Sequence, residues 1–139
     1  ASAARAYGPE SSPADHRDVL VRVESHRAGQ TGAVSKYTYA YDSLARRTSV
    51  VNEGEAFGAD AFSVWRHNAR SELTDSRRGT GTTVQDPPSA EIAAERRLYD
   101  YDHIGNRQTY GLDADPDTTY TANDLNHYIE VAVYGKPAS

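Results

Sequence analysis

Three aspartates at alternate positions are the first residues whose type and spacing suggest chemistry. Asp113, Asp115 and Asp117 form a D-x-D-x-D run, and alternating carboxylates on a loop can offer oxygen ligands to Ca²⁺. A calcium loop of the EF-hand kind also needs a glycine at its sixth position and a glutamate at its twelfth, where this chain has Thr118 and Asp124. The alternative is a solvated acidic hairpin loop, and we expect that loop, without a metal or another cofactor.

Aromatic side chains are the second candidate, because they could form a stacking platform for sugars. Trp65 is the only tryptophan and the best single candidate for ligand binding, together with Tyr39, Tyr99 and Tyr101. The alternative is that the rings pack against one another across neighbouring strands. We favour this structural interpretation, since the rings recur at equivalent positions along the chain, as cross-strand stabilisation requires.

Residues suited to catalysis are present but form no recognisable arrangement. The five histidines lack a metal-binding spacing such as H-x-x-x-H, and the serines, histidines and aspartates include no nucleophile elbow. We therefore predict a protein that is not an enzyme and has no catalytic residues.

Four short turns share the same internal chemistry and divide the chain into repeats. Each opens with an Asp or Asn, whose side chain can accept a hydrogen bond from the backbone two residues on and so fix a type I turn. The fourth residue must then adopt a left-handed conformation and rejoin the ladder as a bulge, which glycine does most easily. The opening residues are Asp42, Asn68, Asp102 and Asn123. The fourth residues are Ala45, Ser71, Gly105 and Asn126.

The segments beside these turns alternate with a period of two. Tyr37, Tyr39 and Tyr41 alternate with smaller or polar residues, and the runs Leu20–Glu24 and Tyr128–Tyr134 show a similar alternation. Successive side chains of a strand point to opposite faces, so each run has one apolar or aromatic face. The pattern predicts an all-β fold of tandem antiparallel β-hairpins that form a curved sheet.

The repeated segments resemble the RHS/YD-repeat family, whose pattern is Tyr-x-Tyr-Asp-x-x-Gly-Arg followed by a strand. Residues 99–107 are close to a full match, and residues 39–47 match except that alanine replaces the glycine. Residues 67–73 and 120–126 are similar to degenerate variants of the repeat. The resemblance extends over roughly residues 20–134, which is most of the chain.

The resemblance implies a structural function. In the family, many such repeats form a hollow shell that can enclose or present a C-terminal toxin or effector domain, and others build adhesive surface proteins. It implies neighbouring repeats as partners, a secreted or cell-surface location, and no self-cleavage core in this segment, because neither Asp86-Pro87 nor Asp115-Pro116 lies in that core's motif. A glycan-binding or adhesive module remains the alternative.

Composition excludes several classes of protein. The net charge of −5 argues against a nucleic-acid binder, which would need a basic face, and no apolar run is long enough to span a membrane. Arginines outnumber lysines thirteen to two, which suits pairing with carboxylates and stacking on tyrosine rings. Since the chain contains no methionine, we expect it to be an internal piece of a longer protein.

The domain boundaries follow from these patterns. We expect an irregular N-terminal segment at 1–18, a hairpin array at 19–134 with a linker-like loop at 78–90, and a tail at 135–139. The runs Leu20–Glu24 and Tyr128–Tyr134 would then be the edge strands of the array, and unpaired backbone groups there favour edge-strand self-association.

Overall fold

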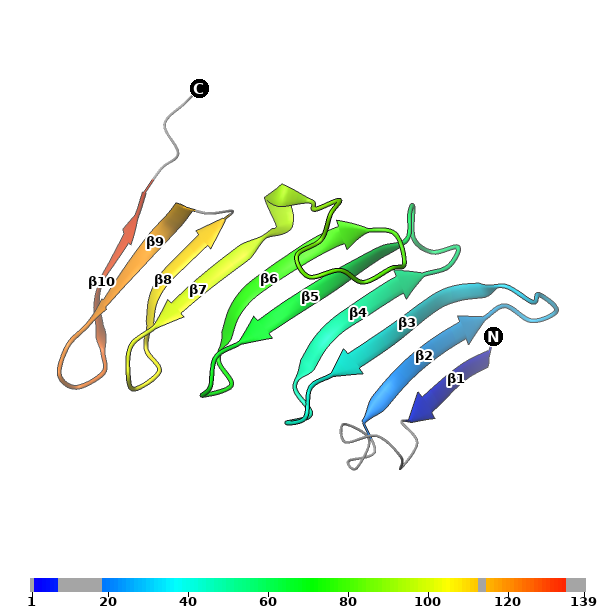
Figure 1. Cartoon of the computed structure of the whole chain (residues 1–139), viewed down its shortest axis with the longest axis horizontal. Helices are drawn as coiled ribbons and strands as arrows, with labels where there is room; N and C mark the ends of the chain where they lie inside the picture. The colour runs from blue at the N-terminus through cyan, green and yellow to red at the C-terminus, as the bar shows by residue number, and fades with distance from the viewer. Residues whose placement is uncertain (1, 8–18, 113–114, 135–139) are drawn as a thin grey trace, which may run out of the picture. The chain divides into compact units, whose positions relative to one another are not determined.

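The structure is a computed structural model that describes residues 2–7, 19–112 and 115–134. Within those residues, ten β-strands form one sheet in which the strand order follows the chain from β1 to β10 (Figure 1). The strands and the single 3₁₀ helix are β1 Ser2–Tyr7, β2 Leu20–His26, β3 Ala33–Tyr41, β4 Arg47–Glu53, β5 Ala61–His67, β6 Leu73–Thr80, η1 Ala93–Glu95, β7 Arg97–Tyr101, β8 Arg107–Leu112, β9 Asp115–Ala122 and β10 Tyr128–Val133. The predicted all-β fold of tandem antiparallel hairpins is confirmed.

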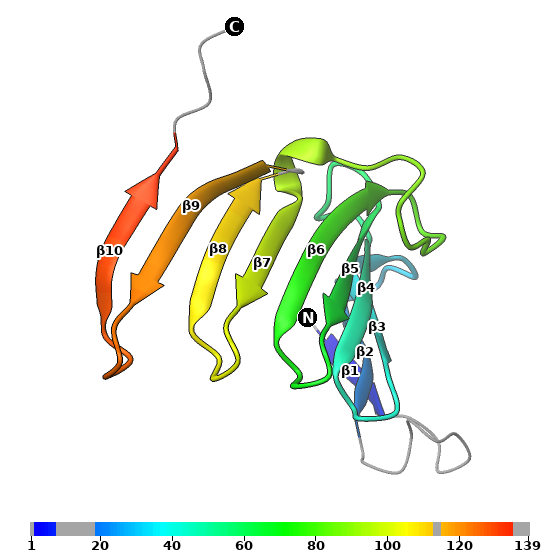
Figure 2. The same ribbon diagram turned by 60° about the vertical axis from the view of Figure 1, so that its left-hand side comes forward.

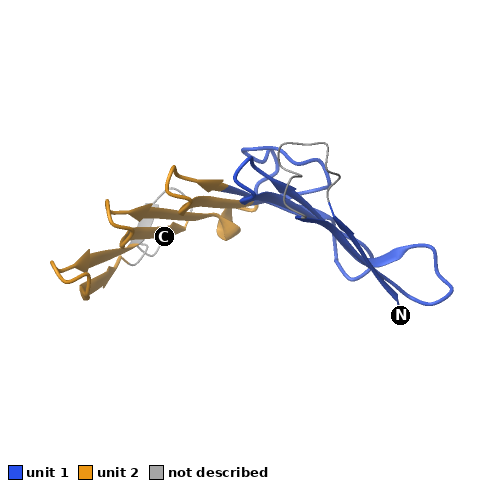
Figure 3. Cartoon of the chain, turned by 90° about the horizontal axis from the view of Figure 1, so that it is seen from below, with its two compact units in different colours: residues 1–65, 78–91 blue, residues 66–77, 92–139 orange. Residues whose placement is uncertain are grey.

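The chain divides into two compact units. The first comprises residues 1–65 and 78–91, and the second comprises residues 66–77 and 92–139 (Figure 3). The boundary falls inside β5 and β6.

The small apolar core of the first unit lies on β4 and β5. Val51 faces Phe62 directly in the antiparallel ladder, and Phe62 is only 2 % exposed. Together with Val64 these residues form the buried cluster. Burial of a few branched and aromatic side chains is a modest hydrophobic contribution, so the ladder hydrogen bonds and cross-strand pairs must carry much of the stability.

The stretch that the sequence suggests is a linker packs against this core at two points, Gly79 and Pro88. β6 continues to Thr80, and the following loop returns so that the Thr80 amide donates to the Ala90 carbonyl at 3.1 Å. A Cβ on Gly79 would stand 2.6 Å from the Phe62 ring and 2.8 Å from Pro88 Cβ. The predicted loop at 78–90 is therefore present only from residue 81, because β6 continues to Thr80, and its glycine and proline permit close packing against Phe62.

The N-terminal segment also differs from expectation. Residues 2–7 form β1 rather than irregular structure, and β1 pairs with β2 from Ser2 opposite His26 onwards. β2 pairs with β3 on its other side, so the prediction that Leu20–Glu24 is an edge strand is wrong. Small residues such as Ala3 and Ala4 have weak strand propensity, and the open ladder of β2 supplies the partner that propensity does not predict.

In the second unit, the hairpins β7–β8 and β9–β10 lie side by side (Figure 2). β7 also pairs with β6, where Asp75 lies opposite Leu98. The Asp75 carboxylate, on a residue only 7 % exposed, is 2.7 Å from Arg77 and 3.8 Å from both Arg66 and Arg96. The three guanidinium groups compensate the negative charge of the buried carboxylate, which would be costly to bury unpaired. Arg96 directly precedes β7, so the cluster also fixes the start of that strand.

β10 is the last strand of the order and pairs with β9 alone among the described residues. Three of its apolar side chains are largely exposed: Ile129 65 %, Val131 54 % and Val133 72 %. An edge of this kind presents both unpaired backbone groups and apolar side chains to solvent.

Candidate functional site

The four turns are built in the same way, atom for atom. In each, the side-chain oxygen of the opening residue accepts hydrogen bonds from the amides two and four residues later, and Asp42 Oδ1 does so from Leu44 and Arg46 at 2.9 Å each. The corresponding acceptors are Asn68, Asp102 and Asn123. The structure thus places all four opening residues in one role, that of an Asx turn that fixes the reversal.

The fourth residue of each turn has a positive φ. The values are 60° for Ala45, 66° for Ser71, 96° for Gly105 and 60° for Asn126. In every turn its amide donates to the carbonyl of the opening residue, at 2.9 to 3.3 Å. Two of the four positions therefore hold a residue type that rarely adopts this conformation.

Turn chemistry lowers the pKa of two carboxyl groups. At both Asp42 and Asp102 desolvation acts to raise the pKa, but hydrogen bonds to the charged form outweigh it. At Asp42 these come from Arg46 and Leu44, and at Asp102 chiefly from Asn106 and Ile104. Both carboxylates are thus held ionised as turn acceptors, which is a structural use and not one suited to proton transfer.

The register of the hairpins repeats as closely as their turns. Tyr41 lies opposite Arg47 with a shift in pairing just before it, and Tyr101 lies opposite Arg107 with the same shift. In the last hairpin, Ala122 lies opposite Tyr128 and a shift again follows. Each shift is the bulge that the left-handed fourth residue requires.

The predicted aromatic candidates contact rings and arginines of their own hairpins. Tyr39 on β3 is stacked beside Tyr37 with ring centroids 6.5 Å apart, and the Arg47 guanidinium lies 4.3 Å above its ring. Tyr99 on β7 packs against Tyr110 at 5.6 Å, and Arg107 lies 5.0 Å from the Tyr99 centroid. These are cation–π contacts at equivalent repeat positions, which the sheet uses to stabilise neighbouring strands.

Trp65 lies in β5, where it is partly exposed. The predicted ligand-binding set is spread over three strands, β3, β5 and β7. Of its members, Tyr101 alone lines the recess described next.

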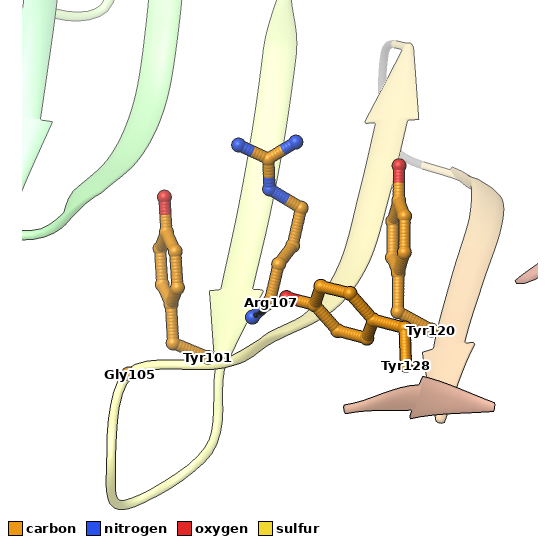
Figure 4. A pocket seen from close by; sticks show the side chains of 5 residues that line it. All are labelled: Tyr101, Gly105, Arg107, Tyr120 and Tyr128. Atoms are coloured by element: carbon orange, nitrogen blue, oxygen red, sulfur yellow. Dashed lines mark hydrogen bonds between the residues drawn. The ribbon is translucent and has the colours of Figure 1, made fainter. Parts of the chain in front are cut away.

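A recess lies on the second unit where its two complete hairpins meet. It has a volume of about 310 Å³ and is lined by Tyr101, Gly105, Arg107, Tyr120 and Tyr128. Figure 4 shows the Arg107 side chain extending between the rings of Tyr101 and Tyr120, with Tyr128 beside its base. Each strand of the two hairpins, β7 to β10, contributes a side chain to this group.

Arg107 is held in the recess by its tyrosine neighbours. Partial burial alone would lower its pKa, but interactions of the guanidinium with Tyr120 and Tyr101 outweigh this and raise the pKa. The Arg107 amide donates to the Tyr128 hydroxyl at 2.9 Å, and Tyr120 packs on Tyr128 with centroids 5.5 Å apart. Arg107 and Tyr128 were not singled out from the sequence, although both stand at the ninth position of a repeat, counted from Tyr99 and Tyr120.

The side chains of the predicted acidic loop lie outside the residues that the structure describes. Asp113 lies outside the described residues, and the side chains of Asp115 and Asp117 in β9 are likewise outside them. Elsewhere in the described part of the chain, no group of three His, Asp or Glu side chains is arranged to hold a metal ion.

No protein-family model matches the chain, and no curated protein is significantly similar to it in sequence. Within the residues that the structure describes, no helix has the length and apolar character needed to cross a membrane.

Proposed function

We propose that this chain is a structural repeat segment, not an enzyme, and that it belongs to a protein of the RHS/YD-repeat family. Its hairpins would form part of the wall of a shell that encloses or presents a toxin or effector domain, in a secreted or cell-surface protein. Neighbouring repeats would be its main partners, with an enclosed domain as a further one.

One observation carries this proposal: the residues that recur are the residues that build hairpins. The opening Asp or Asn supplies two turn hydrogen bonds, and the fourth residue takes the left-handed conformation. The first tyrosine of two repeats lies under the arginine of the same repeat, as in Tyr39 with Arg47 and Tyr99 with Arg107. A chain selected for one catalytic centre would concentrate special residues at one place, whereas here they are distributed along the sheet.

A parent protein in which this segment adjoins an enclosed domain would provide the test. A domain enclosed by the shell should resist a protease in the intact protein, and deletion of residues 33–133 should make it cleavable at the rate of the same domain expressed alone. Equal cleavage of the domain with and without the segment would contradict the proposal.

A glycan-binding or adhesive module is the second candidate, favoured by the aromatic residues Trp65, Tyr39, Tyr99 and Tyr101. Because Trp65 is the only tryptophan, its fluorescence reports on that strand when it is excited at the red edge, where the ten tyrosines do not absorb. A glycan held at Trp65 should quench or shift the emission in a saturable manner. A wall segment should give no response to a panel of neutral and acidic sugars.

A further inference from the structure

We propose that the recess bounded by Tyr101, Arg107, Tyr120 and Tyr128 binds a sugar acid, with the carboxylate at the Arg107 guanidinium and the sugar ring against a tyrosine. The proposal gives a site and a ligand class to the glycan-binding alternative. It does not depend on glycan binding at Trp65 or on the wall function, so its failure would not contradict either of those hypotheses.

Charge is the first argument. Arg107 is the charged residue among those that line the recess. A guanidinium presents several donors in a planar fork that matches a carboxylate, and a charge-assisted hydrogen bond is stronger than a neutral one.

Neighbouring carboxylates do not occupy the guanidinium. Asp102 uses Oδ1 for the amides of Ile104 and Asn106 and Oδ2 for the Asn106 side chain, all at 2.8 to 3.0 Å. Glu72, near Gly105, is paired with Arg70 at 2.9 Å. These two carboxylates are thus engaged in turn structure, and the guanidinium interacts with the uncharged Tyr120 and Tyr101, which do not neutralise its charge.

Shape and lining are the second argument. A volume of about 310 Å³ is at the lower end of small-molecule sites, which are typically lined by aromatic groups with a few polar ones. The Tyr120 and Tyr128 rings meet at 53° and form a corner, and Tyr128 is 49 % exposed at the mouth. The corner offers an apolar ring face beside phenol hydroxyls, the combination that a sugar ring with its own hydroxyls requires.

The β3–β4 hairpin provides a natural comparison, because Tyr41 and Arg47 occupy the positions that Tyr101 and Arg107 have in the β7–β8 hairpin. There the Tyr41 hydroxyl donates to the Leu20 carbonyl at 2.7 Å, and Arg47 lies close over Tyr39. The tyrosine equivalent to Tyr101 is thus engaged by its own sheet. Arg47 is therefore a matched control for Arg107.

The experiment is an NMR titration of the ¹⁵N-labelled chain with glucuronate, glucose and acetate. Glucuronate should shift the amides of Tyr101, Gly105 and Arg107 in a saturable way, whereas glucose and acetate should bind at least about tenfold more weakly. Arg107→Gln should weaken glucuronate binding about tenfold or more, the loss expected for a charge-assisted hydrogen bond. Arg47→Gln should leave the affinity unchanged.

Three results would overturn the proposal. Glucose binding as tightly as glucuronate would show that the charge is not used, and acetate binding as tightly would show that the sugar ring is not. Absence of any shift at these amides would exclude the site. If Arg107→Gln disrupts the hairpin, two other measurements decide: Arg107→Lys should weaken glucuronate binding, and added salt should weaken it in the unmodified chain. Unchanged affinity in both would contradict the proposal.

Discussion

Replacement of Ala45 by glycine should stabilise the β3–β4 hairpin. Ala45 has φ of 60°, and a residue with a Cβ pays roughly 1–2 kcal/mol in this conformation. Glycine avoids that cost but loses more backbone freedom on folding, by roughly 0.5–1 kcal/mol. The difference predicts a net gain of between zero and roughly 1.5 kcal/mol in the free energy of unfolding.

Urea unfolding with a constant m value measures this gain, and hydrogen exchange of the Ala45 amide, which donates to the Asp42 carbonyl, locates it in the turn. Ala40→Gly is the matched control, since Ala40 lies within β3 opposite Ser49, and it should destabilise by roughly 0.5–1 kcal/mol. If Ala45→Gly destabilises the chain as much as Ala40→Gly does, Ala45 is not left-handed and the turn assignment fails.

The remaining predictions concern packing, pH and association. Gly79→Ala should cost roughly 1–3 kcal/mol of unfolding free energy because its Cβ would overlap the Phe62 ring, while Gly58→Ala, with open space around its Cβ, should be nearly neutral in the same urea assay. The lowered pKa values of Asp42 and Asp102 mean that their contribution to stability is complete above their ordinary pKa of 3.8 and is lost as the pH falls through the lower folded value. Replacing both by Asn, the residue that opens the other two turns, should flatten the pH dependence of the urea midpoint below about pH 4; an unchanged acid limb would count against the turn hydrogen bonds. At the exposed edge strand β10, Val131→Lys should suppress concentration-dependent oligomers in sedimentation velocity. A monomer of the unmodified chain at high concentration would contradict the predicted self-association through this strand.

The hairpins could be predicted because their information is local. An Asp or Asn, followed three residues later by a residue that can adopt a left-handed conformation, is sufficient to predict one chain reversal. Asp102 and Gly105 show this within four residues. Period-two patterning then assigns the strands that follow. The fold class needed nothing beyond these two signals.

Features that depend on distant parts of the chain could not be predicted in the same way. The strand β1 forms from small residues because β2 offers a ladder, and Gly79 is needed because Phe62 and Pro88 pack over it. The recess needed the register of two hairpins, which brings Arg107 beside Tyr120 and Tyr128. Sequence spacing identified tyrosines as a class but not which of them share a surface.

Cross-strand NOEs in the labelled chain test the central claim most directly, namely that the hairpins repeat one register around one kind of turn. The account predicts backbone contacts between Tyr41 and Arg47, between Tyr101 and Arg107, and between Ala122 and Tyr128, together with couplings that report positive φ at Ala45 and Gly105. A pairing displaced by one residue in any of these hairpins, or helical contacts across residues 99–107, would contradict it.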